Sequence, residues 1–123
     1  FALEFNSRKI TIPSSVKFIE NSALEFIAVE EISVAKENKY YHSIDGVLFE
    51  TASNTLLRYP PLKPQKEYNV PDGVTKLAPS SFSHCILNDL TIAESVTALG
   101  SGMFAYGSLP KIAIPKNVKE IEW

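Results

Sequence analysis

Short runs in which apolar and polar residues alternate recur along the chain at a fixed distance. In each run a polar or small residue lies between two apolar ones, as in Ile10-Thr11-Ile12, and we take the second apolar residue as the anchor of its repeat. The anchors are Ile12, Val34, Val70, Ile92 and Ile114, separated by 22, 36, 22 and 22 residues. The alternation predicts strands with one buried face, and the period is typical of a solenoid in which one coil carries 14 extra residues.

The residues after each anchor predict a turn followed by a second inward-facing segment. Proline follows the anchor at Pro13, Pro71 and Pro115, and it ends the strand because it has no N–H to donate. Apolar residues then recur four and seven positions after the anchor, at Val16, Val74, Val96 and Val118 and at Ile19, Leu77, Leu99 and Ile121. A coil of this length leaves room for at most one short helical turn, so we expect short extended pieces or a 3₁₀ turn on the far side.

This pattern, idealised as Ile-x-Ile-Pro-x-x-Val-x-x-Ile-x-x-x-Ala-Phe-x-x-Cys-x-x-Leu, resembles the BspA-type, or Treponema-type, leucine-rich repeat. Residues 70–85, Val-Pro-Asp-Gly-Val-Thr-Lys-Leu-Ala-Pro-Ser-Ser-Phe-Ser-His-Cys, match it well, whereas Leu24 replaces the Phe and Ala93 replaces the Pro of the pattern. Ile27 and Gly107 replace its Cys. The resemblance implies a mainly β, right-handed leucine-rich-repeat solenoid over residues 1–123, a single domain of about five coils.

The long coil between Val34 and Val70 predicts a β-hairpin insertion at about residues 38–64. Two apolar runs, 41–49 and 55–60, are joined by polar residues, and Asp45-Gly46 supplies a tight turn before the hairpin. The chain opens on Phe rather than Met and stops in mid-repeat, so we interpret it as a piece of a longer array. Its apolar ends predict self-association.

Composition and charge narrow the possible functions. The chain is 45% hydrophobic and 21% charged, as expected for a folded domain, and no apolar run approaches the length of a membrane span, so we expect no direct membrane insertion. The net charge of −2, with no Lys/Arg block, argues against nucleic-acid binding. The single cysteine, Cys85, excludes an intrachain disulfide or a cysteine-based zinc site and is interpreted as a small buried hydrophobe.

Stacking the coils predicts two polar columns on the outer face of the strands. The position before the anchor gives small polar groups, namely Thr11, Ser33, Asn69 and Thr91. The third position before it gives the carboxylates Glu31, Glu67 and Asp89, bracketed by Lys9 and Lys111. One interpretation is a recognition face that attracts a basic partner; the other is a solvated face whose acids pair with neighbouring lysines.

Aromatic residues near the insertion are further candidate contacts. Tyr40, Tyr41 and Tyr59 flank the predicted hairpin, where they either meet a partner or pack the insertion onto the solenoid. His42 and His84 lie in different coils without zinc-ligand spacing, and the acidic column lacks the Gly-rich Asp/Asn loop of a calcium site. With no nucleophile elbow, phosphate loop or deep pocket expected, the sequence predicts neither an enzyme nor a cofactor.

Similar repeats occur in surface proteins of host-associated bacteria and protists that bind host or matrix proteins. The resemblance therefore implies a non-catalytic protein-interaction or adhesion module of an extracellular or cell-surface protein. Two alternatives stay open. One is a passive structural spacer, and the other is a glycan-binding module that uses the three tyrosines.

Overall fold

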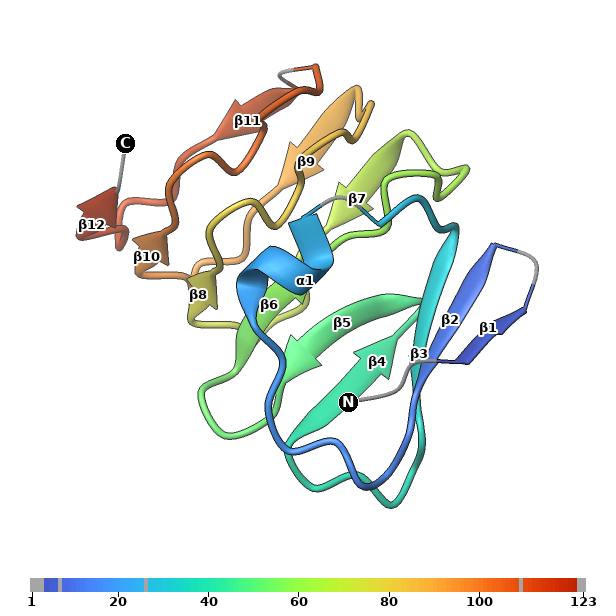
Figure 1. Ribbon diagram of the computed structural model, residues 1–123. Helices are drawn as coiled ribbons and strands as arrows, with labels where there is room; N and C mark the ends of the chain where they lie inside the picture. The colour runs from blue at the N-terminus through green and yellow to red at the C-terminus, as the bar shows by residue number, and fades with distance from the viewer. Residues whose placement is uncertain (1–3, 7, 26, 109, 122–123) are drawn as a thin grey trace.

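The computed structural model describes residues 4–6, 8–25, 27–108 and 110–121, which form a mainly β solenoid of about five turns (Figure 1). Sheet A has the order β1 (Glu4–Asn6), β2 (Lys9–Ile12), β3 (Glu31–Val34), with β1 antiparallel to β2. Sheet C is parallel and contains β7 (Glu67–Asn69), β9 (Asp89–Thr91) and β11 (Lys111–Ala113). Coils 1 to 5 begin at β2, β3, β7, β9 and β11 respectively.

The parallel ladders of sheets A and C join residues that are 22 positions apart. Ile10 pairs with Ile32 in sheet A, and Leu90 lies between Tyr68 and Ile112 in sheet C. These side chains occupy the same position of the repeat, so the coils stack in the register that the period predicts. The solenoid and its coil length are thereby confirmed.

The return side of each coil is short and mostly extended. Sheet B has the order β12 (Glu120–Ile121), β10 (Ala98–Leu99), β8 (Lys76–Leu77), β6 (Thr55–Arg58), β5 (Val47–Glu50), β4 (Tyr41–Ile44). The helix α1 (Asn21–Glu25) provides one short helical turn in coil 1, as expected. Leu77 and Leu99 are buried and adjacent in sheet B, which confirms the inward position seven residues after the anchor.

The insertion is larger than a single hairpin. The predicted hairpin is present as β5–β6, and β4 extends it to a three-stranded antiparallel meander, which joins the coils where β6 pairs in parallel with β8. Asp45 and Gly46 form the turn between β4 and β5 with φ of 52° and 79°. Positive φ at both residues is the geometry of a tight hairpin turn, which an Asp-Gly pair adopts readily.

The meander also divides the hydrophobic core. The N-terminal core contains Ile10, Ile12, Val16, Ile19, Leu24, Val29, Ile32, Tyr41 and Leu48. The C-terminal core is built around Leu77, Phe82, Leu90 and Val96, and it also holds Cys85, which is 2% exposed. Strand β5 contributes to both cores, because Leu48 packs in the first while its neighbours Val47 and Phe49 pack in the second.

Candidate functional site

The solvent side of sheet C presents a flat strip of polar and small residues. Period-two alternation points Tyr68, Leu90 and Ile112 toward the C-terminal core. The residues on either side of them in each strand are exposed, and they are Glu67, Asn69, Asp89, Thr91, Lys111 and Ala113. Figure 1 shows β7, β9 and β11 lying side by side, so these residues form two adjacent columns on one surface.

Two carboxylates in this strip, Glu67 and Asp89, are neighbours that form no ion pair within the described residues. Glu67 pairs in register with Asp89, which pairs in turn with Lys111. Within the described residues, the ion pairs are Arg8–Glu30, Lys9–Glu31 and Lys63–Asp45, so none involves Glu67, Asp89 or Lys111. The interpretation in which the acids are neutralised by neighbouring lysines therefore keeps some support at Asp89, which has Lys111 beside it, but no ladder neighbour of Glu67 in the described strands of sheet C is a lysine.

A shallow groove of about 650 Å³ is lined by residues of β9, of β11 and of the segments that follow these two strands. Coil 4 contributes Asp89, Thr91 and Glu94 to its lining, and coil 5 contributes Lys111 and Lys116. The acidic side chains of the lining thus come from coil 4 and the lysines from coil 5. The groove offers complementary charges to a polar segment that lies along the strands.

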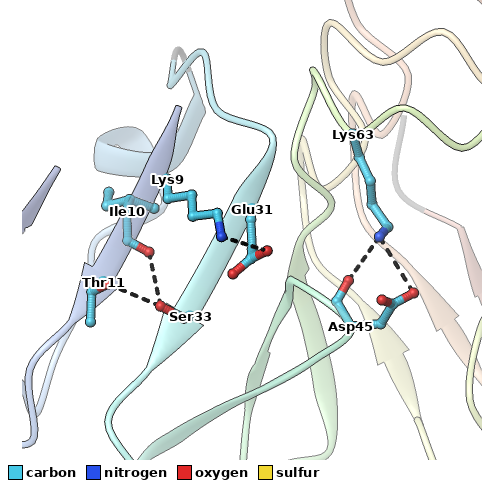
Figure 2. A network of polar contacts seen from close by, with 7 residues as sticks. All are labelled: Lys9, Ile10, Thr11, Glu31, Ser33, Asp45 and Lys63. Atoms are coloured by element: carbon cyan, nitrogen blue, oxygen red, sulfur yellow. Dashed lines mark hydrogen bonds and ion pairs between the residues drawn. The ribbon is translucent and has the colours of Figure 1, made fainter. Parts of the chain in front are cut away.

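Sheet A carries the same columns, but its polar groups bind one another. Lys9 Nζ lies 3.7 Å from Glu31 Oε1, and the hydroxyls of Thr11 and Ser33 are 3.0 Å apart (Figure 2). The Ser33 hydroxyl also donates to the Ile10 carbonyl at 3.5 Å. The polar residues of sheet A are therefore largely satisfied within the sheet.

The expected stack of three carboxylates is wrong at Glu31. In the described part of the chain, Glu31 lies in sheet A and Glu67 and Asp89 lie in sheet C, and these sheets share no ladder. The turn of the insertion occupies the position beside β3, where Ile32 N–H donates to Gly46 O at 2.9 Å. No group of three or more His, Cys, Asp or Glu side chains that could hold a metal ion occurs among the described residues.

Of the two interpretations of the tyrosines, partner contact is wrong for Tyr41 and Tyr59, and packing of the insertion holds for both. Tyr41 is 3% exposed, and its hydroxyl accepts the Ile19 N–H at 2.9 Å. Tyr59 is 1% exposed, with its ring centroid 4.8 Å from that of Tyr68. Both pack the insertion onto the coils, so only Tyr40, which is 46% exposed, can meet a partner from solvent.

Burial and local packing account for the positions of Cys85 and His42. Burial raises the pKa of the Cys85 thiol to about 11, which keeps it protonated and unreactive near neutral pH. The His42 ring stacks on Phe49 with centroids 5.3 Å apart, and burial lowers its pKa. Its Nδ1 lies 2.8 Å from the Thr51 hydroxyl, so local contacts account for its position.

An uncharged ridge, which the sequence analysis missed, is formed by Leu62, His84, Ile86 and Tyr106. Tyr106 is 75% exposed and Ile86 is 61% exposed, and the rings of His84 and Tyr106 stack with centroids 5.0 Å apart. His84 and Tyr106 have φ of 62° and 59°, a backbone conformation that bulky residues rarely adopt. Leu62, His84 and Tyr106 are spaced 22 residues apart, so the period contained the signal for this ridge.

Comparison with known proteins agrees with this geometry. The family model described as "BspA type Leucine rich repeat region" matches residues 1–57 and 62–123 in six copies. No curated protein sequence matches the chain. In the described residues, no helix is long and apolar enough to cross a membrane.

Three solved structures share the fold. A leucine-rich repeat protein from Eubacterium ventriosum is 35% identical, with a TM-score of 0.86, over 93% of this chain and 32% of that one. The pneumococcal vaccine antigen PcpA is 29% identical, with a TM-score of 0.84, over 93% of this chain and 29% of that one. A leucine rich cell surface protein from Faecalibacterium prausnitzii is 27% identical, with a TM-score of 0.71, over 94% of this chain and 29% of that one.

The chain thus spans about a third of the length of these structures. The family model matches nearly every residue, and the stacked 22-residue ladders supply the structural counterpart of that match. The chain belongs to the BspA-type leucine-rich repeat family.

Proposed function

We propose that this chain is a non-catalytic protein-interaction module of an extracellular or cell-surface protein, and that it contacts its partner through the solvent face of sheet C. The observation that carries the proposal is the pair Glu67–Asp89, two exposed carboxylates adjacent in the ladder and without an ion pair among the described residues. Asn69, Thr91 and Ala113 beside them are small enough to let a partner approach closely.

Adjacent like charges on one sheet face destabilise the pairing of their strands. A partner that places Lys or Arg side chains over Glu67 and Asp89 removes this repulsion and gains favourable contacts at the same time. Lys111 and Lys116 contribute the coil 5 part of the groove lining, so the partner is expected to present basic groups to coils 3 and 4 and acidic groups to coil 5.

The relatives support the surface location. One similar structure is a vaccine antigen and another is a cell surface protein, which are properties of those proteins. An extended repeat face without a cluster of metal-ligating residues in the described ranges fits a binding role.

The test is a binding screen of the folded chain on an array of purified extracellular matrix proteins and glycans, at low and physiological salt. A protein signal that weakens with salt is expected. The double variant Glu67→Lys/Asp89→Lys should abolish it, whereas Glu20→Lys/Glu37→Lys, which makes the same change in net charge at exposed sites elsewhere, should bind like wild type. Equal loss in both variants would mean that net charge, rather than sheet C, controls binding.

The alternatives give different results in the same screen. A passive spacer binds nothing on the array, and a glycan-binding module responds to glycans and to Tyr40→Ala. Binding through the uncharged ridge is insensitive to the charge reversals but is lost in Ile86→Ser/Tyr106→Ala. Any of these outcomes would contradict the assignment of the contact face to sheet C.

A further inference from the structure

Strand β5 forms a wall with an apolar core on each side. Val47, Leu48 and Phe49 are each 0–1% exposed, although successive residues of a strand point to opposite faces. Leu48 faces the N-terminal core, and Val47 and Phe49 face the C-terminal core. Sheet A is therefore separated from sheet C by this wall, and the ladder that joins coil 2 to coil 3 is that of β6 and β8 in sheet B.

A β-bulge interrupts the pairing between β5 and β6. Leu48 pairs with Arg58, but Phe49 pairs with Leu56, so Leu57 is the extra residue on β6. A bulge re-aims the side chains that follow it. Here the next residue is Arg58, whose side chain is 1% exposed.

The Arg58 guanidinium joins backbone carbonyls from both sides of the wall. Its Nε donates to Leu24 O at 2.9 Å, at the end of α1 in coil 1. Its Nη2 donates to Ser83 O at 2.8 Å and its Nη1 to Ser81 O at 3.3 Å, both in the return turn of coil 3. The last carbonyls of a helix have no partner within the helix, so Leu24 O takes its hydrogen bond from across the wall.

Two smaller contacts bridge the same boundary near sheet A. Lys63 Nζ donates to Asp45 O at 2.9 Å and lies 3.4 Å from Asp45 Oδ2 (Figure 2). Leu62 N–H donates to Val29 O at 3.0 Å. Lys63 and Leu62 belong to the segment that enters coil 3, whereas Val29 precedes β3 and Asp45 lies in the turn beside it.

We propose that the wall divides the solenoid into two cooperative units, one built around sheet A and the N-terminal core and the other around sheet C and the C-terminal core, and that Arg58 couples their opening. In a repeat protein, cooperativity is carried by the interfaces between neighbouring units. Sheet B crosses the wall through the ladders of β5, β6 and β8, but in the described residues sheets A and C share no ladder. The hydrogen bonds of one buried guanidinium replace part of that ladder, and the inference does not depend on the proposed binding function.

Native-state hydrogen exchange on the intact chain tests this proposal. Two amides with equivalent inter-coil bonds serve as reporters, namely Ala35 N–H to Ile12 O at 2.9 Å and Gly100 N–H to Leu77 O at 2.8 Å. In Arg58→Met, exchange at Ala35 should rise about tenfold or more, the loss expected for a hydrogen bond to a charged group. Exchange at Gly100 should change less than twofold, because the Ser81 carbonyl keeps its bond from Tyr59 N–H.

Arg8→Met is the matched control, since Arg8 directly precedes β2, is largely exposed and forms a surface ion pair with Glu30. It should leave both reporters unchanged. An equal rise at Ala35 and Gly100 in Arg58→Met would show a single cooperative unit, and no rise at either would show that Arg58 does not couple the halves. Either result overturns the proposal.

Wild-type protein provides a measurement that does not depend on the variant's folding. At increasing sub-denaturing urea, Ala35 and Gly100 should show different opening free energies and different urea slopes. Identical free energies and slopes at the two amides would overturn the division into units.

Discussion

Replacing Glu67 by Gln is expected to stabilise the fold slightly. Glu67 is exposed on β7, and its ladder neighbour in sheet C is Asp89. Strands in a sheet are about 4.8 Å apart, and two unit charges at about 5 Å in water repel each other by about 0.8 kcal/mol. Screening at physiological salt removes about half of this energy. The free energy of unfolding should therefore increase by about 0.4–0.8 kcal/mol.

The neighbouring positions supply matched controls with different signs. Asp89 lies between one like and one opposite charge, Glu67 and Lys111, so Asp89→Asn should change the stability by less than about 0.3 kcal/mol. Lys111→Gln loses an attraction to Asp89 and should destabilise by about 0.4–0.8 kcal/mol. All three replacements preserve the size of the side chain closely, so packing contributes little to the comparison.

Urea unfolding at low salt and at about 1 M salt measures the series, because the Debye length falls to about 3 Å at the higher concentration. The differences among the variants should be largest at low salt and should nearly vanish at high salt. If Glu67→Gln destabilised the protein by more than about 1 kcal/mol, Glu67 would have a structural partner, and the argument that it is held ready for a basic ligand would be refuted.

Four further outcomes are expected. Ile92→Ala should cost about 2–5 kcal/mol by chemical denaturation, because Ile92 is 7% exposed, and a loss under about 1 kcal/mol would contradict its inward position. Gly100→Ala should lower the denaturation midpoint strongly, since a Cβ there would lie 2.3 Å from a backbone nitrogen of the neighbouring coil; an unchanged midpoint would contradict this close approach. Cys85, with a pKa raised to about 11 by burial, should resist alkylation at pH 8 until the protein is denatured, and ordinary thiol reactivity in the native state would disprove the burial. Ile114 directly follows the edge strand β11 and Ile121 lies in the edge strand β12, and they are 49% and 43% exposed. The chain should therefore self-associate in sedimentation experiments, whereas a monomer at high concentration would argue against it.

The stacking of the coils was predictable from sequence because a 22-residue period fixes which residues become neighbours. Lys9 lies opposite Glu31, and Thr11 lies opposite Ser33, as their positions in the repeat require. The inward positions were equally predictable, since Val16, Val74 and Val96 share a position in the coil and are all buried. In each case the local sequence pattern and the overall fold require the same type of residue at that position of the coil.

The effect of the insertion on the neighbouring coils could not be predicted from the sequence, for a physical reason. Periodicity gives the register of a coil, but it does not say whether coils 2 and 3 remain in contact when 14 residues intervene. The meander separates Glu31 from Glu67. The ring of Tyr41 packs in the N-terminal core and the ring of Tyr59 packs in the C-terminal core. Arg58 was missed because nothing in its local sequence predicts that a bulge will turn a charged side chain inward.

Sheets A and C are formed by the same position of the repeat, but their outward charges differ. In sheet A, Lys9 precedes Glu31 in the ladder, so the acid is paired within the fold. In sheet C, Glu67 takes the place of that lysine, so Asp89 lies between another acid and Lys111. The backbone geometry of the two ladders is equivalent, so the difference in charge arises from the residue at one outward position of the coil. Inward positions are restricted by packing, and outward ones are not, so the choice of partner can change from coil to coil while the solenoid stays the same.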